Sequence, residues 1–375
     1  MSPTAADRLA ERVSALRGGI AYQAYLEARE AVLRMMDLSS AQPSAYWRHE
    51  LSGFEYMLDA SPLLIERLRH HSFHVTGLRA YDYRPGKDAH RRRLADKLGR
   101  LREIGDERHL VPESPQLGGF GHEIEGELYN LDTLKFFEAM IALDRCGALA
   151  TLASSSQRSV IWEIGAGWGG FARVLKTAVP NSTYVICDLP ELYLFSGPYL
   201  RTLMPDARVR YWSGEDGDAL FEDWEEIDFI LVPAAGLSAI TPPRLDLVVN
   251  MVSFQEMTTE QVRGYLQHAL DAGAHTVYSL NRDRSGYNTE LSGLRELMGE
   301  QLTLEEIVLL DEAYTSLAVK KATAESDGPR QAASLRRLAR RALRASAPSP
   351  RRAGDTNSYR HIVGRPRSEP GPHAR

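Results

Sequence analysis

Cysteine is scarce in this chain, and its scarcity excludes a disulfide scaffold. Cys146 and Cys187 are the only cysteines among 375 residues, and both lie in apolar stretches. Secreted modules that depend on disulfides use cysteine far more densely, so we expect two buried thiols in a reducing compartment. The first 17 residues carry acidic and basic side chains inside their apolar pattern, unlike a secretory signal. The sequence therefore predicts a cytoplasmic protein.

Long apolar runs and dense clusters of metal ligands are also missing. Apolar residues make up 43% of the chain, yet no segment reaches the roughly 18 uncharged apolar residues that a membrane span needs. His70, His71 and His74 lie close together, but no further ligand follows at a second metal-binding spacing. We therefore predict no membrane span, and a partly exposed helix end at these histidines in preference to a metal site.

Charge is distributed unevenly along the chain. The net charge is −5, but from Arg330 to the C-terminus twelve arginines face only two acidic residues, a local balance of about +10. Arginine and leucine interleave over 335–344 as in a short basic amphipathic helix, which suits a membrane surface or a nucleic acid. Ala, Ser, Pro and Gly flank this stretch and favour a solvated, partly disordered segment instead. A nucleic acid partner is therefore not expected.

A glycine-rich turn between two apolar runs is the most informative feature present. The run 160–164 predicts a buried parallel strand, and Gly165, Gly167 and Gly170 then let the backbone turn and approach a ligand. A second apolar run ends in Asp188. A carboxylate about 20 residues after such a loop can accept both hydroxyls of an adenosine ribose. The pattern predicts a nucleotide site.

Glu163, two residues before the first glycine, separates two classes of cofactor. The spacing of Gly165, Gly167 and Gly170 also fits a dinucleotide loop, and a structural turn without a ligand is a third interpretation. An acid at position 163 gives ExGxGxG, which resembles motif I of class I S-adenosylmethionine methyltransferases. In that family the carboxylate lies near the amino acid moiety of the cofactor, whose ammonium it suits, whereas it would repel a pyrophosphate. We therefore favour S-adenosylmethionine over a dinucleotide.

The chain divides into three segments. Residues 1–125 show helical periodicity, end in a Gly- and Pro-rich loop, and are expected to cover the site as a lid or to form a homodimer. Residues 126–320 alternate strands and helices, which predicts an α/β fold with a Rossmann-like parallel sheet. Residues 321–375 are the Arg-rich segment. The candidates for the closing antiparallel strands are 302–309, 316–320 and 359–364.

Five sequence blocks carry a narrower resemblance. They span 112–121, 130–136, 163–171, 183–191 and 253–257. Together they resemble the bacterial family of sugar O-methyltransferases, and the first and last blocks are specific to it. The resemblance implies a class I methyltransferase core, S-adenosylmethionine as cofactor, and a sugar or glycoside hydroxyl as methyl acceptor. Nothing in the residues identifies a hexose, so a non-sugar acceptor such as an amine or phenol, or an inactive cofactor-binding scaffold, stays open.

Two residues are candidates for the general base that a weakly acidic sugar hydroxyl needs. His122 lies in the Gly-rich loop, and an unperturbed imidazole is about half neutral near pH 6.5. Glu256 follows a strand end on the predicted cofactor side of the sheet. Each has an alternative role, since His122 can bond loop backbone and Glu256 can orient its own loop. A divalent ion held by Glu123, Glu256 and Asp283 is a separate hypothesis that the absence of a dense acidic cluster disfavours.

Ligands of parallel α/β sheets bind at the carboxyl ends of strands, where most remaining candidates lie. The glycines are expected to wrap the methionine end of the cofactor, Asp188 to hold the ribose, and Leu189 and Trp212 to sandwich adenine. The predicted cofactor-binding residues are Glu163, Gly165, Gly167, Trp168, Gly169, Asp188, Leu189, Trp212 and Ser253. The predicted acceptor-binding residues are Glu123, Tyr129, Gln255, Asn281 and Arg282.

Overall fold

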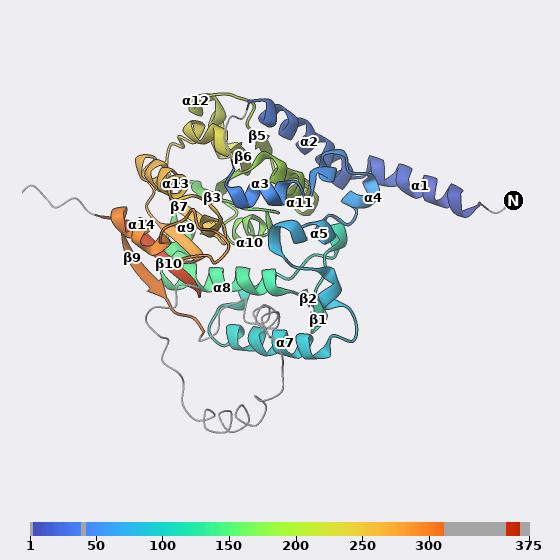
Figure 1. Cartoon of the computed structure of the whole chain (residues 1–375), viewed down its shortest axis with the longest axis horizontal. Coiled ribbons are helices and arrows are strands. Elements are labelled where there is room, and N and C mark those ends of the chain that lie inside the picture. Colours follow the sequence, from blue (N-terminus) through green and yellow to red (C-terminus); the bar gives the residue numbers. More distant parts are fainter. Residues whose placement is uncertain (1–2, 39–42, 311–357, 368–375) are drawn as a thin grey trace, which may run out of the picture.

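An eight-stranded sheet forms the centre of the computed structural model, which describes residues 3–38, 43–310 and 358–367 (Figure 1). Its strands are β3 (Ser159–Ile164), β4 (Ser182–Asp188), β5 (Val209–Tyr211), β6 (Phe229–Pro233), β7 (Leu247–Met251), β8 (Val277–Arg282), β9 (Leu302–Ile307) and β10 (Tyr359–Pro366). They run in the order β5-β6-β4-β3-β7-β8-β10-β9. All neighbours are parallel except β10, which is antiparallel to both β8 and β9. The predicted Rossmann-like α/β fold is confirmed.

The strand order reverses at β3, and this reversal creates a crevice. β3 pairs in parallel with β4 on one side and with β7 on the other. Every residue of these three strands is buried, because helices cover both faces of the sheet. The loops that follow β3, β4 and β7 therefore diverge at one edge of the sheet, where α/β folds bind their ligands.

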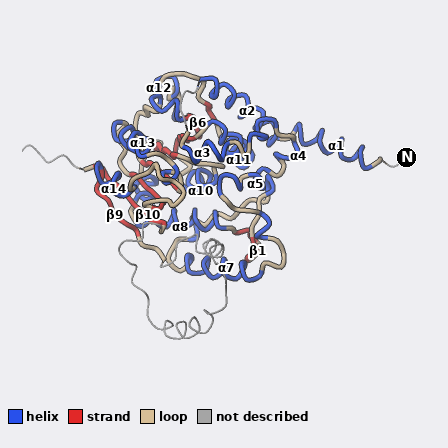
Figure 2. The backbone as a smooth tube through the Cα atoms, viewed as in Figure 1, coloured by secondary structure: helices blue, strands red, loops and turns tan. Residues whose placement is uncertain are grey.

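Helices pack on both sides of the strands (Figure 2). They are α8 (Leu131–Arg145), α9 (Ala148–Ser154), α10 (Gly170–Ala178), α11 (Tyr193–Leu203), α12 (Gly217–Leu220), α13 (Thr259–Asp271) and α14 (Leu294–Gln301). α8 begins with a capping box, in which the side chains of Asn130 and Thr133 each accept the backbone N–H of the other. This cap fixes the start of a helix whose first turns reach the crevice.

Two of the three candidate closing strands form the edge of the sheet. β10 lies between β8 and β9, so the chain after the Arg-rich stretch returns to the fold at the segment 359–364. The third candidate strand, 316–320, and the basic stretch 335–344 lie outside the described residues.

The N-terminal segment forms a helical layer against the sheet domain. α2 (Ile20–Leu38) packs on α11, and its buried side chains join the same apolar core as the strands. α1 (Ala5–Gly18) extends away from the body of the molecule and buries none of its residues (Figure 1). Across the part of the chain that the structure describes, no helix is long and apolar enough to cross a membrane.

Within the helical periodicity of residues 1–125, two stretches each form several short elements instead of one helix. The pattern over 46–58 gives α3 (Ala45–Leu51) and a separate 3-10 turn, η1 (Glu55–Asp59). The pattern over 63–71 gives α4 (Pro62–Ile65) and α5 (Leu68–His71), with α6 (Phe73–Thr76) directly after them. Helices this short are stabilised by tertiary packing, so burial of particular side chains outweighs periodicity here.

A second, smaller apolar cluster includes side chains of α8 and of the segment that lies below α8 in Figure 1. α7 (Asp88–Arg102) packs on α8, and an antiparallel hairpin of β1 (His122–Ile124) and β2 (Glu127–Tyr129) completes the cluster. The Gly- and Pro-rich stretch therefore ends in a strand that is packed into this cluster.

Candidate functional site

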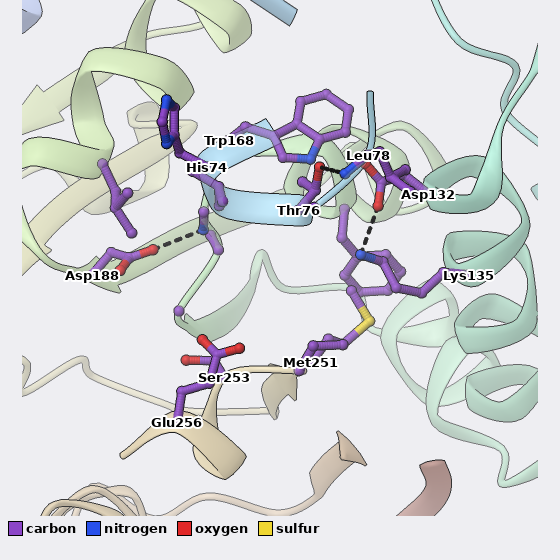
Figure 3. A pocket seen from close by; sticks show the side chains of 18 of the residues that line it. His74, Thr76, Leu78, Asp132, Lys135, Trp168, Asp188, Met251, Ser253 and Glu256 are labelled. Carbon is purple, nitrogen blue, oxygen red and sulfur yellow. Dashed lines mark hydrogen bonds and ion pairs between the residues drawn. The ribbon is translucent and has the colours of Figure 1, made fainter. Parts of the chain in front are cut away.

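A cavity of about 520 Å³ lies at the carboxyl ends of β3, β4 and β7. α3 and α6 line it from the N-terminal layer, and α8 and the segment after β7 line it from the sheet domain. Figure 3 shows Asp188, Ser253 and Glu256 at the strand ends, with His74 and Thr76 across from them. The cavity thus coincides with the crevice predicted by the strand order.

The glycine loop after β3 requires residues without side chains at two positions. Gly165 has φ of +75°, and a Cβ there would lie 2.0 Å from the Ser253 hydroxyl oxygen. Gly167 has φ of +58°, and a Cβ there would lie 2.7 Å from a Val75 methyl carbon. Left-handed backbone and these close neighbours exclude larger residues. The loop is therefore held between the exit of β7 and the N-terminal layer, and both glycines line the cavity.

Asp188 ends β4 and lines the cavity beside this loop. Its carboxylate accepts the backbone N–H groups of Gly167 at 2.7 Å and of Leu189 at 2.8 Å (Figure 3). Burial raises the pKa of Asp188 to about 7, although both hydrogen bonds act in the opposite direction. A carboxyl group fixed by backbone donors in this way suits a pair of ligand hydroxyls.

Glu163 lies within β3 and is only 1% exposed. The Tyr184 hydroxyl donates a hydrogen bond to its carboxyl group at 2.8 Å. Burial raises the pKa of Glu163 to about 8, Asp188 raises it further by charge repulsion, and the Tyr184 bond and Lys135 lower it. The group gains its negative charge most easily when a cation enters the cavity beside it.

Glu256 lies in the short turn η8 (Phe254–Glu256) after β7. Burial raises the pKa of Glu256 to about 8, and the charges of Asp188 and Glu50 add to that effect. The Trp47 side chain hydrogen-bonds its carboxyl group, and the Ser44 hydroxyl donates to its main-chain oxygen at 2.7 Å. Glu256 therefore joins the strand ends to the N-terminal layer.

The backbone just before Glu256 is strained. Val252 has φ of +62°, which is rare for a β-branched residue and costs about 1–3 kcal/mol. Buried amides hold this turn: Asn250 donates to the last carbonyl of β3 at 2.7 Å, accepts the Phe254 N–H at 2.9 Å, and accepts from Asn281 at 2.8 Å. Strain of this kind concentrates at functional sites, and here it fixes the direction in which Glu256 leaves the strand.

An aromatic wall, made of Tyr46, Trp47, Tyr287 and Tyr359, lines the cavity beside Glu256. The rings of Tyr46 and Tyr287 have centroids 5.3 Å apart, and Trp47 meets Tyr46 edge-on at 5.6 Å. The buried amide of Gln255 donates to the hydroxyls of Tyr287 at 2.9 Å and Tyr359 at 3.2 Å. Gln255 thus stands behind the wall and fixes two of its rings.

The structure brings together most of the predicted cofactor residues. The predicted cofactor residues that line the cavity are Glu163, Gly165, Gly167, Trp168, Asp188 and Ser253, and the candidate base Glu256 lines it with them. Near the strand ends but outside the lining lie the predicted cofactor residues Gly169, Leu189 and Trp212 and the predicted acceptor residues Gln255, Asn281 and Arg282. Trp212 donates its indole N–H to the Glu215 carbonyl at 2.8 Å, and the Arg282 guanidinium lies 4.5 Å from the Tyr359 ring centroid, behind the aromatic wall.

Three predicted site residues lie apart from the cavity, on the hairpin of β1 and β2. The Nε2 of His122 is 2.7 Å from the Nδ1 of His90. Burial and the neighbouring imidazole lower the pKa of His122 to about 4. Glu123 is exposed on the same strand, and Tyr129 is buried in the second apolar cluster. The hairpin therefore places none of the three beside the glycine loop.

Two lining residues, Asp132 and Lys135, and Arg69 behind the lining had no signal strong enough to single them out in the sequence. Lys135 and Asp132 form an ion pair of 2.8 Å on the first turns of α8 (Figure 3). Arg69 of α5 is buried, makes two hydrogen bonds of 2.8 and 3.1 Å to Glu113, and places its guanidinium 3.4 Å from the Trp168 ring centroid. An i, i+3 charge pair on an otherwise apolar helix start was the available clue for α8. No local pattern marks Arg69.

In the described ranges, no three His, Cys, Asp or Glu side chains gather as metal ligands would. His71 bonds the Tyr56 hydroxyl at 2.8 Å, and His74 lines the cavity. Three acids were considered as ligands of a divalent ion. Glu123 lies on β1 and Glu256 in η8, and Asp283 accepts the backbone N–H of Arg295 at 2.7 Å.

Comparisons with known proteins give remote likenesses only. No family model matches the sequence, and no curated protein matches it. Among solved structures, the pyocyanin biosynthetic protein PhzM is 10% identical over 61% of this chain and 57% of its own, with a TM-score of 0.32. WbdD is 12% identical over 60% of this chain and 39% of its own, with a TM-score of 0.36. An O-methyltransferase family protein from Burkholderia thailandensis is 12% identical over 75% and 71%, with a TM-score of 0.32.

The match spans little more than half the length of PhzM and well under half of WbdD. Likenesses this distant assign no activity to the chain.

Proposed function

We propose that this protein is an S-adenosylmethionine-dependent methyltransferase. The observation that carries the proposal is the presence of three buried carboxyl groups, Glu163, Asp188 and Glu256, around one glycine loop, each with a raised pKa. A cationic ligand stabilises the ionised form of all three, whereas the phosphates of a dinucleotide are repelled by the ionised form and disfavour it. This preference supports a sulfonium nucleoside over NAD.

The residues present fit that cofactor. Asp188, held by two backbone donors, would accept the ribose hydroxyls, and Glu163 would face the ammonium of the amino acid moiety. Gly165 and Gly167 line the cavity without side chains, so a ligand can approach the backbone of the loop there. When bound, the cofactor supplies an electrophilic methyl carbon on a cationic sulfur.

Proton removal from the acceptor falls to this chain, and we assign it to Glu256. Its carboxyl group lines the cavity near Asp188, and His122 lies in the separate hairpin. A base of this kind typically contributes about 10² to 10⁴ in rate, and alignment of the nucleophile contributes more. The N-terminal layer over the cavity would keep water from competing with the acceptor. Trp47 and Ser44 would then act as positioning residues for Glu256.

For the acceptor we propose a sugar or glycoside hydroxyl. The aromatic wall offers ring faces for the apolar side of a pyranose, and Glu50 and Glu256 offer acceptors for its hydroxyls. A phenol or amine would use the same wall, and these acceptors are separated by experiment.

Calorimetry with S-adenosylmethionine and with NAD tests the cofactor. We expect binding of S-adenosylmethionine only, and a loss of about tenfold or more in affinity for Asp188→Ala, since charge-assisted hydrogen bonds contribute about 1.5–3 kcal/mol. Asp206→Ala, at an exposed site, is the matched control. Binding of NAD without S-adenosylmethionine would overturn the proposal.

Transfer of labelled methyl groups to pooled glycosides, phenols and amines then tests the activity. Product on a glycoside hydroxyl supports the proposed acceptor, and product only on phenols or amines replaces it. Cofactor binding with no transfer to any pool would indicate a scaffold without turnover.

A further inference from the structure

The cavity lining is strongly acidic. Among the described residues that line it, the carboxyl groups are those of Glu50, Asp132, Glu163, Asp188 and Glu256. The ammonium of Lys135 is 2.8 Å from Asp132, so that pair neutralises itself. Burial lowers the pKa of His74, which keeps its imidazole neutral at pH 7. The lining therefore holds more carboxyl groups than the single net positive charge of one cofactor would balance if all of them ionised.

Two of these carboxyl groups, those of Glu50 and Glu256, lie at the aromatic wall. Glu50 and Glu256 both act by charge on Tyr46, and burial together with these two charges raises the pKa of its hydroxyl. Glu256 acts on Tyr287 in the same way. Two carboxyl groups are therefore within electrostatic reach of rings whose faces attract cations. Aromatic rings and carboxylates together are the usual surroundings of a bound ammonium group.

The fixed positions of these rings strengthen the case for a specific site. Gln255 holds the hydroxyls of Tyr287 and Tyr359 from behind, and the Arg282 guanidinium covers the Tyr359 ring from its own side. A wall held in this way loses little side-chain entropy when a ligand binds. The arrangement favours specific recognition of one chemical group over nonspecific binding.

We propose that the aromatic wall with Glu50 and Glu256 binds a protonated amine of the acceptor, so that the substrate class is an amino sugar or a related amino alcohol. This inference rests on the proposed function and narrows it. The same carboxylates would repel anionic acceptors, such as nucleotide sugars or uronic acids.

The ammonium is a binding group in this scheme and the neighbouring hydroxyl is the nucleophile. The hydroxyl oxygen forms the new C–O bond while the C–S bond breaks, and the electron pair of that bond stays on sulfur. The hydroxyl proton goes to a carboxylate oxygen of Glu256. The ammonium keeps its protons and therefore has no lone pair to attack with. Its charge also favours the ionised form of Glu256, which is the form that accepts the proton.

Matched acceptors test this directly: the methyl glycoside of glucosamine, its N-acetyl derivative, and a nucleotide sugar. The first two share their ring hydroxyls and differ in charge. We expect kcat/KM to be about tenfold or more higher for the amine, the equivalent of about 1.4 kcal/mol, with methyl on oxygen. Glu50→Gln should reduce that preference to about threefold or less and raise KM for the amine, while Glu55→Gln, on the exposed face of η1, keeps the full preference.

Equal or faster transfer to the N-acetyl glycoside or the nucleotide sugar would overturn the inference, as would methyl on nitrogen. No transfer to the glucosamine glycoside, together with no binding of it to the complex with S-adenosylhomocysteine, would also overturn it. Calorimetry keeps the two proposals apart: if S-adenosylmethionine binds but amines are not preferred, only this inference fails. If S-adenosylmethionine does not bind, the proposed function itself fails.

Discussion

Single carboxyl groups define the chemistry of this cavity. Glu163, Asp188 and Glu256 are buried, and burial raises the pKa of each toward neutral pH, to about 8, 7 and 8. At pH 7 the ligand-free protein therefore holds protons on these groups that ordinary carboxyl groups would have lost. A cation bound beside these carboxyl groups favours their ionised form and so displaces the protons.

Binding of S-adenosylmethionine at pH 7 should release protons for this reason. We expect roughly half a proton to two protons per site, seen as a dependence of the calorimetric heat on the ionisation enthalpy of the buffer. S-adenosylhomocysteine lacks the sulfonium charge and should release fewer. Equal heats in all buffers would show that binding ionises none of the three groups, which would remove the main support for a cationic ligand.

Glu163 should also make the stability of the ligand-free protein depend on pH. Its folded-state pKa lies above its ordinary value of 4.5, so its contribution is fully favourable below about pH 4.5 and is lost as pH rises through about 8. Glu163→Gln keeps the shape and cannot ionise. It should raise the unfolding free energy at pH 9 by up to about 5 kcal/mol relative to the unmodified chain, since one pKa unit is about 1.4 kcal/mol and the pKa rises from 4.5 to about 8. Urea unfolding at pH 5 and pH 9 measures both effects.

The matched control for that experiment is Glu225→Gln, an exposed residue. It should leave the unfolding free energy within about 0.5 kcal/mol at both pH values. If Glu163→Gln and the unmodified chain lose stability equally between pH 5 and pH 9, the carboxyl group of Glu163 is not what titrates in this range.

At the scale of elements, α5 and the glycine loop are joined through one side chain. Arg69 is buried between Glu113 and the ring of Trp168, which lies in the loop. The planar guanidinium makes two hydrogen bonds to one carboxyl group and stacks flat on the ring at once, a combination that the compact ammonium of lysine cannot reproduce. Arg69 is therefore a positioning residue for the loop, acting through Trp168.

Arg69→Lys should weaken binding of S-adenosylmethionine by about threefold to thirtyfold, since cation–π contacts of this kind contribute about 0.5–2 kcal/mol. The substitution keeps a cation beside Glu113, so the chain still folds with a modest loss of stability. Arg67→Lys, exposed in the same segment, should change neither quantity. A lower melting temperature with unchanged affinity would assign Arg69 a purely structural role.

Elements differ in how far local pattern predicts them. β3, β4 and β7 are continuous apolar runs, so their place in a parallel sheet follows from composition, and Asp188 and Glu256 follow from the rule that strand ends meet at one edge. The position of His122 depends on how a short hairpin packs against α7, which no periodicity encodes. The aromatic wall likewise combines α3, a loop and β10, separated by more than 300 residues of chain. Only tertiary packing brings such groups together.

At the scale of the whole molecule, the N-terminal layer closes the cavity. Ser44 and Trp47 bond Glu256, and Val75 packs against Gly167, so the layer contacts both the acceptor side and the glycine loop. A ligand of cofactor size in the cavity would lie against α3 and α6. The layer is thus expected to be more dynamic when the cavity is empty and more stable when a ligand occupies it.

Hydrogen exchange can measure this coupling, because a ligand that binds only the closed state slows every opening that must release it. At S-adenosylmethionine concentrations of 100 times the dissociation constant, exchange of amides in α3 and α6 should slow by up to about 100-fold, the equivalent of about 2.7 kcal/mol. Amides of α1 should not change, since that helix buries no residue and contacts no part of the cavity. If α3 and α6 exchange at the same rate with and without ligand, the layer does not close over the cofactor. A change confined to α1 that depends on protein concentration would instead assign the N-terminal segment to dimerisation.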